Sequence, residues 1–262
     1  MSRQPDGPPP PPVVQRLRIR YAKRGRLRFT SHRDIARAFE RAVRRSGVPI
    51  AFSAGFSPHP KISYAGAAPT GVGSEAEYLE IGLAQVQEPD QVRTALDRAL
   101  PPDIEIVDVV DATTSAGSSL AERIEASRWQ ISLPDVPLTD ACSAVEALLA
   151  RPSAPVERPT KDGTRTIDVR TALVSVVVGD APSAAREPGE GEMNAGCATL
   201  DVVVQHATPA VRPDDILTAL RLFGALSTPV APVVTRLAQG LIDETSPTDH
   251  RRLLDPLKDL TS

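Results

Sequence analysis

Two histidines, an aspartate and a lysine between positions 32 and 61 are residue types that could carry out chemistry. His32 and Asp34 stand at the expected start of a helix, and His59 and Lys61 follow in a loop whose prolines exclude a regular helix. If that loop folds back over the helix N-terminus, the four side chains converge where backbone N–H groups already favour an anion. Two histidines beside a phosphate could then act as general acid and base for RNA cleavage, which makes His32 and His59 the candidate catalytic residues.

Structural roles stay open for the same residues. Asp34 could cap the helix, and His32 and His59 could form hydrogen bonds within a tight loop. Together with Glu75 or Glu77 the histidines could instead hold a divalent cation, although no metal site is predicted. The residues expected to complete the loop and its anion site are Ser31, Asp34, Ser53, Gly55 and Phe56.

Basic residues are concentrated in the same part of the chain. From Arg16 to Lys61 there are thirteen Lys or Arg against Asp34 and Glu40, a net charge of +11, while the whole chain has a formal charge of −3. Such asymmetry predicts an anionic partner for one surface. The residues expected to contact a nucleic acid are Arg18, Arg20, Lys23, Arg28, Arg33, Arg37, Arg41, Arg44, Arg45 and Lys61.

Two alternatives compete with nucleic-acid binding at these arginines. They could simply be solvated on an exposed strand and helix, or Glu75, Glu77 and Glu80 on a neighbouring strand could pair with them and cancel part of the charge. Two aromatic residues, Phe29 and Phe56, could stack on bases of a single strand, although packing in the core is expected for Phe29.

The elements that must position these residues begin with a strand. Leu17, Ile19 and Tyr21 alternate with arginines, which predicts a strand with one buried face and one exposed arginine face. After a turn at Gly25, the strand is expected to resume through Leu27 and Phe29.

A helix is predicted next, with Ser31 as its N-cap and Gly47 as its C-cap. Its apolar residues recur at helical spacing on one face and its arginines lie toward the other. The sequence therefore predicts an amphipathic helix with a basic ridge.

The remaining pattern predicts a mixed α+β fold built from two halves. Strands are expected at 50–53, 61–65, 76–84 and 104–110 and a helix at 89–100, and a second round follows with strands at 127–133, 167–178, 199–206 and 233–242 and helices at 139–151 and 213–223. The order strand, helix, strand, strand, helix, strand predicts two ferredoxin-like (βαββαβ) halves with antiparallel sheets.

Composition shifts suggest the domain boundaries. The expected divisions are a disordered proline-rich tail at 1–14, a basic ferredoxin-like domain at 15–111, a linker at 112–126, a second ferredoxin-like domain at 127–243 and a polar tail at 244–262.

Several classes of protein are disfavoured by composition. Only Cys142 and Cys197 occur, without close spacing, so neither a disulfide framework nor a cysteine-ligated metal or iron–sulfur centre is supported, and no cofactor is predicted. There is neither an apolar run of about 18 residues nor an apolar leader, so the protein is expected to be cytoplasmic and without membrane contact.

Three stretches carry a resemblance to a known family. The sequences Leu-Arg-Phe-Thr-Ser-His-Arg-Asp at 27–34, Ser-Ala-Gly-Phe-Ser-Pro-His-Pro-Lys-Ile-Ser at 53–63 and Gly-Ser-Glu-Ala-Glu-Tyr at 73–78 resemble the radical-SAM-linked proteins. Members of this domain of unknown function are fused to a radical SAM enzyme or stand alone. The resemblance implies a role in modification or processing of ribosomal or transfer RNA, with a radical SAM enzyme or ribonuclease E/G as expected partner. The chain lacks a Cys-x3-Cys-x2-Cys set, so it could only be an accessory to such an enzyme.

Three hypotheses follow. The first is an RNA-binding adaptor whose Arg16–Lys61 surface grips ribosomal or transfer RNA. The second is an endoribonuclease-like enzyme that uses His32 and His59. The third is a protein-interaction module for an acidic partner.

Overall fold

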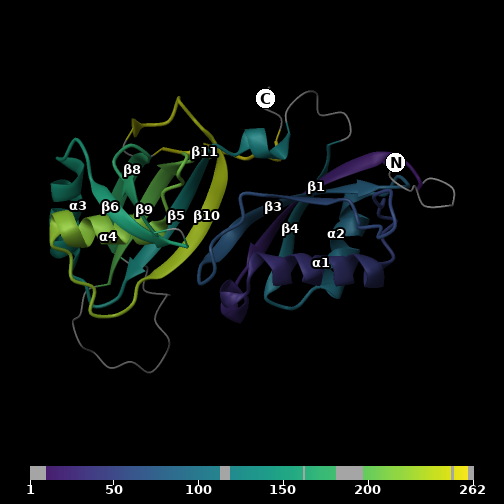
Figure 1. The fold of residues 1–262 in the computed structure, drawn as a ribbon, viewed down its shortest axis with the longest axis horizontal. Coiled ribbons are helices and arrows are strands. Elements are labelled where there is room, and N and C mark those ends of the chain that lie inside the picture. Colours follow the sequence, from purple (N-terminus) through teal and green to yellow (C-terminus); the bar gives the residue numbers. More distant parts are fainter. Residues whose placement is uncertain (1–9, 113–118, 162, 181–196, 249–250, 259–262) are drawn as a thin grey trace. The chain divides into compact units, whose positions relative to one another are not determined.

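The computed structural model describes residues 10–112, 119–161, 163–180, 197–248 and 251–258. The chain divides into two compact units (Figure 1): unit 1 holds the described residues of Met1–Ile124 and Asp255–Ser262, and unit 2 holds those of Glu125–Leu254. The division falls within the range proposed as a linker, part of which lies outside the described residues, as does most of the proline-rich tail. Both units are mixed α+β structures with antiparallel sheets, which confirms the predicted fold class at that level.

Unit 1 consists of one sheet with two helices on one of its faces. Its elements in chain order are β1 (Gln15–Lys23), the 3-10 helix η1 (Gly25–Phe29), α1 (His32–Ser46), β2 (Ile62–Ala65), β3 (Gly73–Leu83), α2 (Pro89–Ala99), β4 (Ile104–Asp111) and the 3-10 helix η2 (Leu120–Arg123). The strand order within the unit is β4-β1-β3-β2, and all neighbours are antiparallel. Apolar residues of β1, such as Leu17 and Ile19, pack with Phe39 of α1 and Leu96 of α2 in one core.

The ends of α1 are as the sequence predicts. The Ser31 side chain accepts a hydrogen bond from the N–H of Asp34, and Gly47 ends the helix in the left-handed conformation with φ of 72°. The start of the helix is therefore fixed by local hydrogen bonding.

The stretch before α1 differs from the prediction. Leu27 and Phe29 do not resume the strand but lie in η1. Gly25, at φ of 51°, turns the chain, and the N–H groups of Leu27 and Thr30 then donate to carbonyls three residues earlier. These short-range hydrogen bonds, characteristic of a 3-10 helix, replace strand pairing.

The predicted exposed arginine face of β1 is only partly present: Arg16 is exposed, with 60% of its side chain accessible. Arg18 is only 4% exposed and Lys23 only 3%. The reason is a second layer within unit 1: Leu120 and Ile124, at the ends of η2, pack with Leu257 against Ala76 and Tyr78 of β3. This layer covers part of the sheet face opposite α1 and α2, around Ala76 and Tyr78.

Unit 2 repeats the combination of one sheet and two helices and adds a hairpin. Its elements are β5 (Ala126–Leu133), α3 (Leu138–Leu149), β6 (Pro155–Thr160), β7 (Gly163–Asp168), β8 (Leu173–Asp180), β9 (Ala198–Gln205), α4 (Pro213–Gly224), β10 (Val233–Ile242) and β11 (Leu253–Leu254). The strand order is β10-β5-β9-β8, again antiparallel throughout, with β11 paired to β10. Gly224 lets α4 approach α3, since a Cβ there would lie 2.5 Å from the Ala144 carbonyl oxygen.

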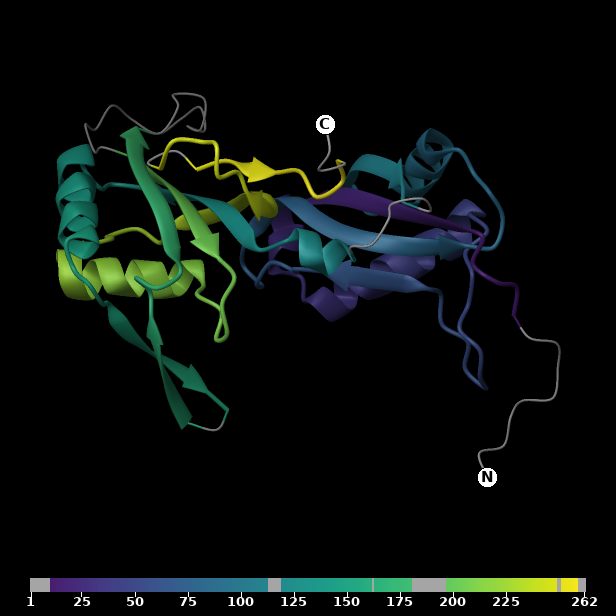
Figure 2. The same ribbon diagram turned by 90° about the horizontal axis from the view of Figure 1, so that it is seen from above.

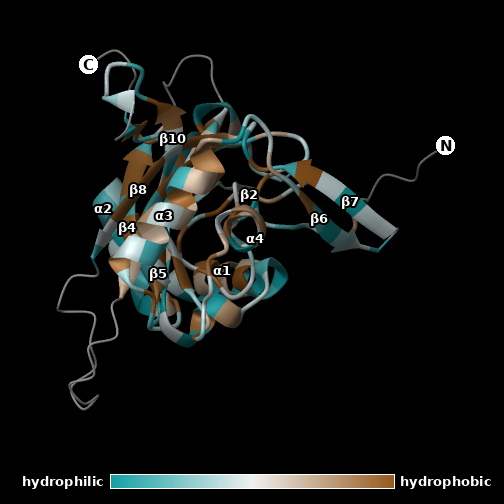
Figure 3. Ribbon diagram, turned by 90° about the vertical axis from the view of Figure 1, so that its left-hand side faces the viewer, coloured by the Kyte–Doolittle hydropathy of each residue, from teal (hydrophilic) through white to brown (hydrophobic). Residues whose placement is uncertain are grey.

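The single strand predicted at 167–178 is divided between two sheets. β7 pairs with β6 in a separate hairpin, and β8 pairs with β9. Figures 2 and 3 show the hairpin extending away from α4. Arg158, near the middle of β6, forms an ion pair through its guanidinium with the buried Asp215 of α4. The strand breaks after β7 because the Asp168 carboxylate accepts the N–H of Arg170 and turns the chain.

Candidate nucleic-acid interface

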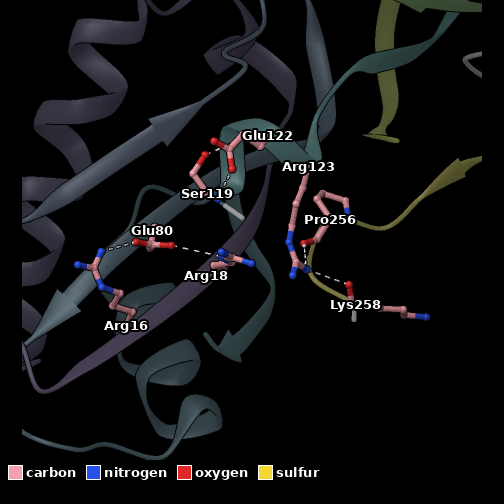
Figure 4. A network of polar contacts seen from close by, with 8 residues as sticks. All are labelled: Arg16, Arg18, Glu80, Ser119, Glu122, Arg123, Pro256 and Lys258. Carbon is pink, nitrogen blue, oxygen red and sulfur yellow. Dashed lines mark hydrogen bonds and ion pairs between the residues drawn. The ribbon is translucent and has the colours of Figure 1, made fainter. Parts of the chain in front are cut away.

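The arginines of β1 are committed to partners inside unit 1. Glu80 of β3 accepts hydrogen bonds from Arg16 at 3.0 Å and from the buried Arg18 at 3.3 Å (Figure 4). Arg20 donates to the Glu75 carbonyl oxygen at 2.9 Å. The arginines of β1 are therefore bonded to the acidic strand beside them, and Glu80 offsets part of their charge.

Arg24, just after β1, is held in the same way. It forms ion pairs with Glu75 and Glu105, and these hydrogen bonds raise the pKa of its guanidinium further above its usual range. Of the acidic residues expected to compete with binding, Glu77 is also engaged: its carboxylate is buried and accepts the N–H of Ala68.

The arginines of the helix α1, unlike most of those of β1, are exposed. We call Arg33, Arg37, Arg41, Arg44 and Arg45 the α1 stripe. At 100° per residue these five positions lie within about 120° of the helix circumference, and they extend along roughly 18 Å of its axis. All five are exposed, whereas Ile35, Phe39 and Ala42 on the other side are buried in the core.

Three members of the α1 stripe are not neutralised by the described part of the chain. Within it, Arg33, Arg41 and Arg44 form neither hydrogen bonds nor ion pairs. Arg37 contacts Asp34 at 3.4 Å, an exposed pair of little energetic weight, and Arg45 donates to the Ala99 carbonyl oxygen. The stripe therefore has free guanidinium groups.

The α1 stripe has an electrostatic cost to the helix itself. Arg33 and Arg37, Arg37 and Arg41, and Arg41 and Arg45 are like charges spaced four residues apart, each pair unfavourable by about 0.2–0.5 kcal/mol. Arg33 also lies in the first turn, where the helix dipole disfavours a cation. Arg44 and Arg45 lie in the last turn, where the dipole favours a cation. Helix stability therefore does not explain Arg33, Arg37 and Arg41, which favours a role for these three in binding an anion.

Aromatic side chains are exposed next to these charges. Phe29 is 60% exposed, so the packing in the core expected for it is wrong, and the Arg28 guanidinium lies 4.7 Å from its ring centroid. Phe29 precedes the N-cap of α1 by two residues. Phe56 is 71% exposed in the loop between α1 and β2. Both rings are available to a stacking partner.

The two histidines have different neighbours, and no contact joins them among the described residues. His32 begins α1 and packs edge-on against Tyr64 of β2, with ring centroids 5.0 Å apart. His59 precedes Tyr64 by five residues along an extended segment, on the order of 15 Å. Within the described part of the chain neither imidazole forms a hydrogen bond. The structure therefore does not assemble the general acid and base pair.

The residues of the expected anion site also separate into two groups. Ser31 and Asp34 form hydrogen bonds with each other at the start of α1. Ser53 instead closes the 53–59 loop, where its hydroxyl accepts the N–H of His59 at 3.0 Å and Gly55 takes a φ of 127°. Lys61 lies beside this loop and is exposed. The loop is built locally and does not fold over the N-terminus of α1.

Tyr64 is a further residue of this region that the sequence did not single out. Its hydroxyl is buried and has no hydrogen-bond partner among the described residues. Burial, and secondly the charge of Glu40, raises the pKa of Tyr64. Its neutral ring therefore serves as the surface on which His32 and Phe39 pack.

Two findings limit other kinds of site. No group of three or more His, Cys, Asp or Glu among the residues that the structure describes is arranged to hold a metal ion. None of the described helices is both long and apolar enough to cross a bilayer.

Unit 2 contains a pocket lined by residues that include Arg128, Arg251 and Arg252. These residues follow no sequence motif, so the pocket could not be predicted from the sequence.

Comparison with known proteins defines the class of protein to which this chain belongs. Residues 16–213 match the family described as "Uncharacterized protein conserved in bacteria (DUF2344)", so the chain is a member of that family. No curated protein matches the chain.

Among solved structures, the chain is similar to a "Dye-decolorizing protein from V. cholerae" at 12% sequence identity. The match covers 86% of this chain and 91% of that one with a TM-score of 0.19. A likeness at this level carries no argument about activity.

Proposed function

We propose that this protein is an RNA-binding adaptor and that the α1 stripe is its contact with the phosphates of single-stranded RNA. The observation that carries the proposal is the set of free guanidinium groups on Arg33, Arg41 and Arg44, exposed along one side of α1. Each phosphate that such a group neutralises releases counterions and adds affinity that depends on salt and not on sequence.

The exposed aromatics favour a single strand over a duplex or an acidic protein. Phe29 offers a ring face beside Arg28 close to the start of the α1 stripe. Stacking of a base on an aromatic ring contributes roughly 1–3 kcal/mol and requires an unpaired base. The acidic-partner hypothesis uses the same arginines but gives the rings no role.

The endoribonuclease hypothesis loses its support because no contact joins His32 and His59 among the described residues. We infer instead a non-catalytic role, in which the bound RNA is presented to another enzyme. A radical SAM enzyme or ribonuclease E/G is the partner implied by the family resemblance.

We also infer that each unit is a ferredoxin-like domain. The support is the shared spatial order of the strands, which is β4-β1-β3-β2 in unit 1 and β10-β5-β9-β8 in unit 2. In each unit a helix follows the first and the third of these four strands in chain order, which are β1 and β3 in unit 1 and β5 and β9 in unit 2. In unit 1 part of the sheet face that such domains often display to RNA is covered by η2 and Leu257, and the arginines of β1 form hydrogen bonds within the unit, so binding is assigned to the helix.

The proposal is tested by fluorescence anisotropy with a labelled single-stranded RNA of 20 nucleotides. A variant carrying Arg33→Gln, Arg41→Gln and Arg44→Gln is expected to bind at least about tenfold more weakly, because charge-assisted hydrogen bonds contribute roughly 1.5 kcal/mol or more each. Phe29→Ala should weaken binding further if the ring stacks on a base.

The matched control removes the same charge from sites outside the α1 stripe. Arg16→Gln, Arg24→Gln and Arg221→Gln replace three exposed arginines that have partners within the chain. Retained binding by this control supports the assignment, and equal loss in both triple variants contradicts it. Displacement of the RNA by an equal charge concentration of polyglutamate would favour the acidic-partner hypothesis.

A further inference from the structure

We propose that unit 2 contains a second, independent site: a pocket between the sheet and the segment after β10 that binds a small phosphate ester. The pocket has a volume of about 300 Å³. This size is at the lower end of the range for small-molecule sites. The site is separate from the α1 stripe and does not depend on RNA binding.

The floor of the pocket is the face of the sheet opposite its core. Arg128 of β5, Val203 of β9 and Ser175 of β8 are cross-strand neighbours in one row, and Asp201 and Val177 form the next row across β9 and β8. The alternate residues of β9, such as Leu200 and Val202, are fully buried on the other face. Figure 2 shows the segment after β10, in yellow, across the sheet from α4.

The opposite wall carries two cations, Arg251 and Arg252. The Arg251 guanidinium is held in place, since it donates to the carbonyl oxygens of Glu244 at 3.2 Å and Ser246 at 2.9 Å. The Arg252 N–H donates to the Ser246 hydroxyl, and its carbonyl accepts the N–H of Asp243. The Arg251 guanidinium and the Arg252 backbone are therefore held in place before any ligand arrives, which lowers the entropic cost of binding.

The charges that line the pocket do not cancel. Arg128 is neutralised by Asp201, which accepts hydrogen bonds from its Nε at 2.8 and 3.0 Å and raises the pKa of the guanidinium. Arg251 and Arg252 have no such carboxylate in the lining. Two guanidinium groups match the charge and hydrogen-bond capacity of a phosphate monoester.

Two carboxylates lie beside the pocket without lining it. Asp243 is engaged by Thr245, whose hydroxyl and N–H lower the pKa of the carboxyl, with smaller contributions from the nearby Arg252 and Arg251. Glu244 is 82% exposed and its carboxylate is 3.9 Å from Arg251. The two carboxylates therefore offset part of the positive charge from outside the lining.

The residues of the pocket floor also indicate the chemistry of the part of the ligand that is not phosphate. Val177 gives it a small apolar surface, whereas Val203 is only 1% exposed, and the Ser175 hydroxyl, on a side chain with little exposure, forms no hydrogen bond within the described part of the chain. A compact organic group against Val177 with one polar atom toward Ser175 would make contacts that free phosphate cannot make. The site is therefore expected to prefer a phosphate ester over free phosphate.

The test is isothermal titration calorimetry of the full chain with adenosine 5′-monophosphate, inorganic phosphate and adenosine. We expect saturable binding of the nucleotide, weaker binding of phosphate and none of adenosine. Arg252→Gln should weaken nucleotide binding at least about tenfold. This exposed side chain makes no hydrogen bond with described residues, so its replacement should leave the fold intact, as checked by circular dichroism.

Two controls keep the result interpretable. Arg221→Gln, an exposed arginine on α4, and the triple variant of the α1 stripe should bind the nucleotide like the unmodified protein. Phosphate bound as tightly as the nucleotide would overturn the assignment to an ester. No binding of either at millimolar concentration, or unchanged binding by Arg252→Gln, would overturn the site altogether.

Discussion

Asp168 accepts three hydrogen bonds at the turn between β7 and β8, from the Ser153 hydroxyl at 2.6 Å and from the N–H groups of Ala154 and Arg170 at 2.9 and 3.0 Å. Burial acts to raise the pKa of this carboxyl, but the hydrogen bonds together outweigh it and lower the pKa below its usual value. The ionised form is therefore stabilised by folding.

The depressed pKa of Asp168 predicts a pH-dependent contribution to stability. The contribution is complete above the unfolded-state pKa of about 3.9 and is lost as the pH falls through the lower folded-state value. Asp168→Asn should reduce the free energy of unfolding at pH 7 and pH 5, and the difference from the unmodified protein should shrink below about pH 4. Urea denaturation at pH 7, 5 and 3 measures the free energy of unfolding of both proteins. The control is Glu157→Gln, which removes an exposed carboxylate. A difference that does not change with pH would contradict the role of the carboxylate.

Individual residues could be predicted from sequence where their partners are local. Ser31 and Gly47 cap α1 as expected, because the relevant hydrogen bonds join neighbours in the chain. The exposure of Arg18 could not be predicted, because the residues that cover its sheet face, such as Leu120 and Leu257, are remote in sequence. Glu80 was correctly suspected as a partner of the strand arginines, since alternation placed both on one face.

The helix α1 is predicted to gain stability when its charge is reduced. Arg41→Gln removes the unfavourable pairs with Arg37 and Arg45, so the free energy of unfolding should rise by about 0.4–1 kcal/mol at low salt, while RNA affinity falls. Arg221→Gln on α4 has no arginine four residues away and should change stability by less than about 0.5 kcal/mol.

Chemical denaturation at 20 mM and 500 mM salt checks this prediction, because screening should abolish the gain. Loss of stability in Arg41→Gln would show that the arginine serves the fold, and the argument that the α1 stripe exists for binding would fail.

Elements with strong periodicity were predicted well, and those defined by unusual turns were not. The helices at 89–100 and 213–223 correspond closely to α2 and α4. The break between β7 and β8 was missed, because the turn after Asp168 contains neither glycine nor proline and its signal is a side-chain hydrogen bond. The 3-10 helix η1 was missed because Leu27 and Phe29 alternate as a strand would.

For the molecule as a whole, local patterns were sufficient for the α+β class and the order of elements, because each strand and helix carries its own hydrophobic period. Local patterns were not sufficient to predict which residues form the two proposed binding sites. The charge asymmetry of the first 61 residues pointed to an anionic partner, but only the structure separates the paired arginines of β1 from the α1 stripe. The unit 2 pocket joins β5, β8, β9 and the segment after β10, so its composition depends on the tertiary fold.

The salt dependence of RNA binding tests the central claim most directly. For a single strand each phosphate contact contributes about 0.7 to the slope of log K against log salt concentration. Anisotropy titrations from 50 to 300 mM KCl should give a slope shallower by about 2 for the variant lacking Arg33, Arg41 and Arg44 than for the unmodified protein. The same slope in both proteins would contradict the claim that these guanidinium groups contact phosphate.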